Sequence, residues 1–133
     1  MTPLYILLAE DEPEISNLIT RWLEHDGHHV TCAANGAEAA AISQAKEFDL
    51  VVTDMLMPET DGMQLIAIIK KVHPKTRILA ISGGGHALDG LDCLRMAKAM
   101  GADGAVKKPF KRDSFMAGVT VAMALRTPKG LLS

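Results

Sequence analysis

Short apolar runs alternate along the chain with longer segments in which apolar residues recur every three or four positions. The runs at residues 4–9 and 50–54 are uninterrupted, a pattern typical of strands buried on both faces of a sheet. After Pro13 the apolar residues have the spacing of an amphipathic helix, and Gly27 marks its end. The whole pattern predicts strands at residues 4–9, 29–33, 50–54, 77–81 and 105–107, and helices at residues 13–27, 36–47, 63–72, 88–100 and around 115–123.

The alternation of strands and helices predicts an α/β fold with a five-stranded parallel sheet. Right-handed crossovers between parallel strands place the connecting helices on both faces, which gives a doubly wound arrangement. The 133 residues are within the usual size of one domain. The predicted elements end near Arg126, and only residues 127–133 remain as a short C-terminal tail. We therefore expect one domain without a fused output domain.

Composition and charge argue against nucleic-acid and membrane partners. Hydrophobic residues make up 48% of the chain and charged residues 23%, as in ordinary globular proteins. The net charge of -2 gives no electrostatic attraction to nucleic acid or to an anionic membrane. No apolar stretch approaches the roughly 20 residues that cross a bilayer, and the N-terminus does not have the features of a signal peptide. We expect a cytoplasmic protein.

The cysteines and clustered histidines have ordinary structural interpretations. Cys32 and Cys93 lie in apolar surroundings and are expected to be small, reduced core residues. His25, His28 and His29 are at a predicted helix end, where we expect a solvated turn and not a metal site.

Polar residues follow the predicted strands at the ends where open parallel sheets bind their ligands. They are Glu10 and Asp11 after the first strand, Asp54 at the end of the third, Ser82 after the fourth and Lys108 after the fifth. Because these strand ends meet at one edge, we expect the side chains to lie close together. Three carboxylates in one place repel one another, and a hard divalent cation with oxygen ligands relieves that repulsion. Mg²⁺ is the predicted cofactor.

This combination of groups is suited to phosphoryl transfer. In that chemistry the protein mainly aligns the attacking oxygen and stabilises negative charge that is spread over the phosphoryl group. Asp54 is the predicted attacking group, because aspartyl phosphates are known covalent intermediates. The ammonium of Lys108 and the hydroxyl of Ser82 supply a positive charge and a hydrogen-bond donor, while Glu10 and Asp11 serve the metal.

Four motifs carry a family resemblance. They are Ala9-Glu10-Asp11-Glu12, Asp54-Met55-Leu56-Met57-Pro58 with Asp61-Gly62, Ile81-Ser82-Gly83, and Gly101-Ala102-Asp103 leading to Lys108-Pro109-Phe110. In this order and spacing the chain resembles the receiver domain of bacterial two-component response regulators, in its single-domain, chemotaxis-type (CheY-like) form. The resemblance implies a flavodoxin-like sheet with strand order 2-1-3-4-5 and a receiver domain over residues 1–126.

The resemblance assigns Asp54 as the acceptor of a phosphoryl group from a sensor histidine kinase or a histidine phosphotransfer protein. It implies that Asp11 binds Mg²⁺ directly and that Glu10 binds it through a water molecule. The main-chain carbonyl of Leu56 completes the protein ligands.

For the phosphoryl group itself, the resemblance implies contacts from Ser82 and Lys108, with Pro109 as a cis proline. Such a domain is a signalling switch rather than an enzyme, assisting only its own phosphorylation and dephosphorylation. Its downstream target is expected on the face made by the fourth helix, fifth strand and fifth helix. Apolar residues on the polar side of the fourth helix, Met96 among them, support a partner surface there.

Two features depart from the family pattern, and two positions that tune dephosphorylation have no polar side chain. Ala105 replaces the aromatic residue that usually moves with the hydroxyl of the switch, and residues 83–85 form a glycine run that we expect to carry the conformational signal instead. Leu56 and Gly84 bring no polar side chain to orient an attacking water, which predicts a long-lived phosphoryl group.

Two alternatives remain for the function. One is a structural pseudo-receiver that is never phosphorylated. The other, less favoured, is an aspartyl-phosphate phosphatase of the haloacid-dehalogenase type, a class that needs a second Asp where this chain has Leu56.

Overall fold

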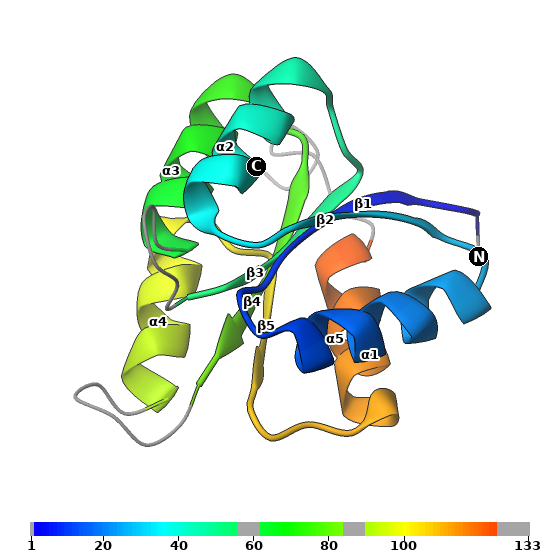
Figure 1. Ribbon diagram of the computed structural model, residues 1–133. Coiled ribbons are helices and arrows are strands. Elements are labelled where there is room, and N and C mark those ends of the chain that lie inside the picture. Colours follow the sequence, from blue (N-terminus) through cyan, green and yellow to red (C-terminus); the bar gives the residue numbers. More distant parts are fainter. Residues whose placement is uncertain (1, 56–61, 84–89, 125–133) are drawn as a thin grey trace.

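The computed structural model describes residues 2–55, 62–83 and 90–124, apart from the side chains of residues 90–94. Within these ranges the five predicted strands form one parallel sheet in the order β2-β1-β3-β4-β5 (Figure 1). The predicted topology is therefore confirmed. The strands are β1 (Tyr5–Ala9), β2 (His29–Ala33), β3 (Leu50–Asp54), β4 (Arg77–Ser82) and β5 (Gly104–Lys107).

Five helices connect and cover the strands. Gly27 and Gly101 end the first and fourth helices with φ angles of 90° and 116°, a backbone conformation that glycine adopts without strain. The second helix is shorter than predicted, because Lys46 has an extended backbone and Phe48 is buried in the core. The helices are α1 (Pro13–His25), α2 (Gly36–Ala45), α3 (Gly62–Val72), α4 (Gly90–Met100) and α5 (Arg112–Met123).

The helices form two layers with the sheet between them (Figure 1). On one face, residues of α2, α3 and α4, among them Leu65 and Ile69, pack against one side of the strands. On the other face, residues of α1 and α5, among them Ile19 and Phe115, pack against the opposite side. The central strand β3 is buried along its whole length, which explains its uninterrupted apolar sequence. None of the helices in the described ranges has the length and hydropathy that a membrane crossing requires.

Two expectations about single residues are wrong. Cys32 is exposed because it lies on β2, the edge strand of the sheet. His28 is buried, and its Nδ1 accepts a hydrogen bond from the backbone N–H of Leu4 at 3.0 Å. The side chain of Cys93 lies outside the described residues.

Candidate functional site

The neighbouring strands β1 and β3 bring the acidic residues together. In the register of this pair Ala9 lies beside Thr53, so that Glu10 and Asp54 follow at the same edge of the sheet. Gly62, the first residue of α3, lies against the backbone of Asp54, and any side chain at this position would collide with the carbonyl oxygen of Asp54. The start of α3 is thus packed directly on the end of β3.

Lys108 approaches the same point from the end of β5. Its Nζ lies 2.8 Å from Asp54 Oδ2 and 3.0 Å from Glu12 Oε1, and it donates a hydrogen bond to each. It also lies 3.2 Å from Glu10 Oε1, an ion-pair contact without the geometry of a hydrogen bond. The peptide bond between Lys108 and Pro109 is cis, as the family resemblance implied.

Burial makes this cluster electrostatically unusual. The side chain of Glu10 is fully buried, and its burial, together with the charge of Asp54, raises the pKa of its carboxyl group to about 7. Burial alone would lower the pKa of Lys108, but the hydrogen bonds to Asp54 and Glu12 and the nearby negative charges outweigh it and raise that pKa. Lys108 is therefore a fixed positive charge shared by several carboxylates.

The carboxylates fit a divalent cation. Glu10, Asp11, Glu12 and Asp54 each have a carboxylate oxygen within 4.8 Å of the others. Glu10 Oε2 accepts a hydrogen bond from the backbone N–H of Glu12 at 3.1 Å, whereas the buried Glu10 Oε1 has no hydrogen-bond partner among the described residues. A buried carboxylate oxygen that makes an ion pair but accepts no hydrogen bond, beside three further carboxylates, matches the oxygen ligands that Mg²⁺ prefers.

Of the residues selected from the sequence, the structure groups Glu10, Asp11, Asp54 and Lys108. Ser82 is fully buried at the end of β4, where its Oγ donates to the carbonyl of Gly83 at 3.3 Å. Glu12 was not selected, although it contacts Lys108 directly. Its position next to Glu10 and Asp11 was the available signal, and the contact itself depends on a residue 96 positions away.

Several predicted features lie outside the described residues. They include Leu56, the expected main-chain metal ligand, and Gly84 and Gly85 of the glycine run. Ala105 is described: it pairs with Ala80 in the β4–β5 register and packs partly buried against the core on the α3 and α4 side. The proposed signalling role of the glycine run stays a prediction.

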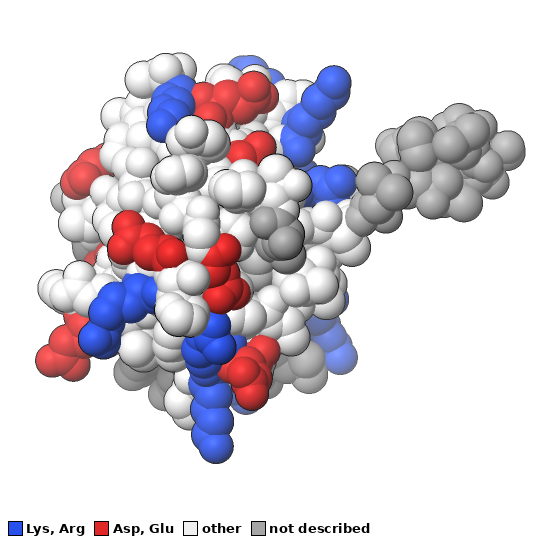
Figure 2. Space-filling view, turned by 90° about the vertical axis from the view of Figure 1, so that its right-hand side faces the viewer, with Lys and Arg blue, Asp and Glu red and all other residues white. Residues whose placement is uncertain are grey.

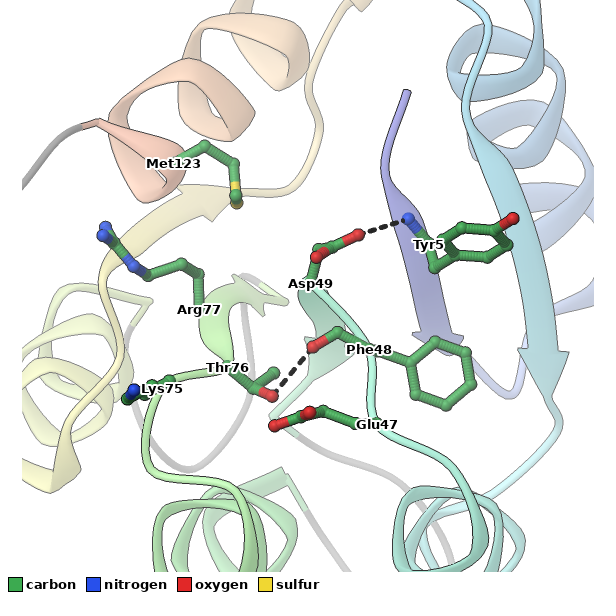
Figure 3. A pocket seen from close by; sticks show the side chains of 8 residues that line it. All are labelled: Tyr5, Glu47, Phe48, Asp49, Lys75, Thr76, Arg77 and Met123. Atoms are coloured by element: carbon green, nitrogen blue, oxygen red, sulfur yellow. Dashed lines mark hydrogen bonds between the residues drawn. The ribbon is translucent and has the colours of Figure 1, made fainter. Parts of the chain in front are cut away.

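A cleft of about 360 Å³ lies at the other end of the sheet (Figure 3). It is lined by residues at or near the starts of strands β1, β3 and β4, with Tyr5, Asp49 and Arg77 among them. Here the polar groups bind the backbone: Asp49 Oδ2 accepts from the N–H of Tyr5, and Thr76 Oγ1 donates to the carbonyl of Phe48, both at 2.8 Å. The cleft is therefore separate from the acidic cluster.

The surface charge is mixed on the face of the molecule that Figure 2 shows. On the face shown in Figure 2, acidic and basic side chains of the described residues are interspersed, with no broad area of one sign. The described residues on this face form no basic patch of the kind that binds a nucleic acid.

Comparisons with known proteins agree with the geometry. The family model of the response regulator receiver domain matches residues 6–120. The transcriptional regulatory protein GlrR of Escherichia coli (strain K12) is 30% identical over 126 residues, which cover 95% of this chain and 28% of GlrR. The response regulator receiver protein CpdR of Brucella abortus is 40% identical over 78 residues, covering 59% of this chain and 65% of CpdR.

Solved structures show the same likeness. NtrX from Brucella abortus has a TM-score of 0.83 and 29% identity, covering 92% of this chain and 27% of the NtrX chain. A response regulator receiver domain protein from Clostridium thermocellum has a TM-score of 0.79 and 30% identity, covering 97% of this chain and 98% of its own. The chain thus spans less than a third of GlrR and NtrX, but nearly all of the Clostridium protein.

Proposed function

The chain belongs to the family of response regulator receiver domains, and we propose that it is a signalling switch in which Asp54 accepts a phosphoryl group. The observation that carries this proposal is the position of Asp54. It is buried at the end of the central strand, in hydrogen-bond contact with Lys108 and beside a group of carboxylates suited to Mg²⁺. The donor would be a phosphohistidine on a sensor histidine kinase or a phosphotransfer protein.

In the transfer, a carboxylate oxygen of Asp54 attacks the phosphorus atom. The new bond joins Asp54 to phosphorus, and the phosphorus–nitrogen bond of the donor breaks, with its electron pair remaining on the imidazole. The ammonium of Lys108, already 2.8 Å from Asp54 Oδ2, is placed to stabilise negative charge on the phosphoryl oxygens. The hydroxyl of Ser82, at the end of the adjacent strand, would donate to another phosphoryl oxygen.

Magnesium would be held by Glu10, Asp11 and Asp54, with the main-chain carbonyl of Leu56. When bound, it supplies the positive charge that lets the carboxylates and an incoming phosphoryl group share one site. The buried Glu10 Oε1, which has no hydrogen-bond partner among the described residues, supports this assignment.

The output would be a protein contact and not a reaction on an external substrate. We propose that the downstream target binds the face of α4, β5 and α5, where Met96, Met100 and Val121 are exposed. Action in the cytoplasm, a domain spanning residues 1–126 and the lack of a fused output domain stay predictions.

The test is the intact mass of the protein after incubation with Mg²⁺ and acetyl phosphate. We expect the wild type to gain one phosphoryl group, and chelation of the metal or the change Asp54→Asn to prevent it. Asp49→Asn, which removes a carboxylate at the opposite end of the sheet, is the matched control and should still gain the group. If the wild type gains nothing the chain is a pseudo-receiver, and if Asp54→Asn gains as much as the wild type another residue is the acceptor.

A further inference from the structure

Glu12 occupies a helix-capping position without capping the helix. It is the N-cap residue of α1, and its carbonyl accepts the hydrogen bond from the N–H of Ser16 at 2.9 Å. Ser, Thr, Asp and Asn are the usual N-cap residues, because their short side chains reach the free N–H groups of the first turn. The Glu12 side chain makes no such bond. It extends to Lys108 instead, where Oε1 lies 3.0 Å from Nζ.

The contact gives Lys108 a third carboxylate partner, on the solvent side. The side chains of Asp54 and Glu10 are 5% and 0% exposed, whereas that of Glu12 is 59% exposed. An ammonium group has three N–H donors, and here it faces three carboxylates. A phosphoryl oxygen that binds Lys108 therefore competes with these carboxylates, two of which accept hydrogen bonds from it, for a single ammonium group. Glu12 is the most exposed of the three carboxylates, so its side chain is the least restrained by packing and the easiest to displace.

We propose that Glu12 is a positioning residue that restrains phosphorylation by holding Lys108 on the solvent side of Asp54. The inference rests on the proposed function and adds a regulator of the same site. Glu12 competes with the incoming phosphoryl group for a single ammonium. A partly exposed ion pair of this kind contributes modestly, so its removal should speed phosphorylation by roughly two- to fivefold.

Two variants of Glu12 separate the effect of its contact with Lys108 from the effect of its negative charge, and a third variant is a control. Glu12→Gln keeps the length of the side chain and removes the charge. Glu12→Asp keeps the charge but shortens the side chain by one methylene, and it should fold well because Asp is a favoured N-cap residue. Glu14→Gln is the matched control, since Glu14 is exposed in the first turn of the same helix and makes no contact with Lys108.

Two measurements then decide the proposal. The first is the NMR signal of the Lys108 ammonium and its hydrogen exchange in metal-free protein, a readout that needs no phosphorylation. The second is the rate of phosphoryl gain at a low concentration of acetyl phosphate with Mg²⁺. We expect both Glu12 variants to shift the Lys108 signal, to speed its exchange and to accelerate phosphorylation, while Glu14→Gln matches the wild type.

The proposal is overturned if Glu12→Asp phosphorylates at the wild-type rate while Glu12→Gln is faster, because charge at the site entrance would then be the whole effect. It is also overturned if the Lys108 signal is unchanged in both Glu12 variants. A wild type that gains no phosphoryl group contradicts the proposed function, and the Lys108 signal still decides whether Glu12 holds the ammonium.

Discussion

At the carboxyl end of the sheet Lys108 is grouped with three carboxylates, whereas at the amino end Asp49, Arg77 and Asp103 each bond to the backbone, and Asp103 also pairs with Lys70. Lys108 lies among Asp54, Glu10 and Glu12, and the negative charges outnumber the positive one. At the amino end, Arg77 Nη1 donates to the carbonyls of Ala122 and Ala124 at the end of α5, at 3.2 and 2.7 Å.

The difference separates groups that stabilise the fold from groups that the proposed function assigns to a ligand. A backbone carbonyl or N–H that receives a side-chain partner at the amino end is satisfied permanently, and the fold gains stability. At the carboxyl end the carboxylates repel one another and Glu10 Oε1 has no hydrogen-bond partner among the described residues. Such an arrangement costs stability and is typical of functional sites.

The largest expected effect comes from removing the central cation. Lys108→Met leaves buried carboxylates without a partner and should lower the free energy of unfolding by about 3 kcal/mol in the presence of a chelator. Because Mg²⁺ supplies positive charge to the same carboxylates, it should restore part of the loss. Urea unfolding with chelator and with Mg²⁺ measures both quantities.

Arg77→Met is the matched change at the amino end. It removes two hydrogen bonds to the backbone and should cost about 1 to 2 kcal/mol, equally with and without Mg²⁺. If Mg²⁺ restores the stability of Arg77→Met to the same extent as that of Lys108→Met, the amino end responds to the metal too, and the contrast between the two ends is contradicted.

The second prediction compares two carboxylates. Glu10→Gln removes a buried charge whose pKa is raised to about 7, and above that pH it should stabilise the metal-free protein by about 1 kcal/mol. The same change should weaken Mg²⁺ binding. Asp49→Asn at the amino end keeps an oxygen that accepts from the N–H of Tyr5, and its effect on stability should be close to zero. Chemical unfolding and calorimetric titration with Mg²⁺ test the pair, and a destabilised Glu10→Gln would contradict it.

The same comparison shows what the sequence could and could not predict. The strands and the acidic residues at their ends follow from short apolar runs, two of which stop at Glu10 and Asp54, because local patterning is a property of short segments. The order of the strands was implied by the family resemblance and not by the patterning. Glu12 was missed because its partner Lys108 is remote in the sequence. Cys32 was placed in the core from its apolar neighbours, although the strand order implied by the resemblance already makes the second strand an edge strand.

His28 was misread for a related reason. Its position after a helix end suggested solvent, but β1 begins at Tyr5, and the preceding N–H of Leu4 takes the His28 ring as its acceptor. A side chain that completes the backbone of another element is recognised only once the two elements are placed together.

The smallest expected effect is the pH dependence that His28 contributes. Burial lowers the pKa of His28 below its ordinary value of 6.5. The negative charge of Asp26, the second largest influence, raises this pKa and offsets part of the effect of burial. As the pH falls through 6.5, the unfolded chain gains a proton that the folded chain does not, so stability falls with pH. Glu10 acts in the opposite direction, because its folded pKa of about 7 is above the ordinary 4.5 and the folded chain takes up its proton first.

The two contributions partly cancel in the wild type between pH 7 and 5, so His28 must be observed without Glu10. In Glu10→Gln, metal-free stability should fall as the pH is lowered from 7 to 5.5, and adding His28→Asn should flatten that slope. Urea midpoints at three pH values provide the measurement. Equal slopes in the two variants would mean that another group titrates, and that His28 at the amino end is as indifferent to protonation as an exposed histidine.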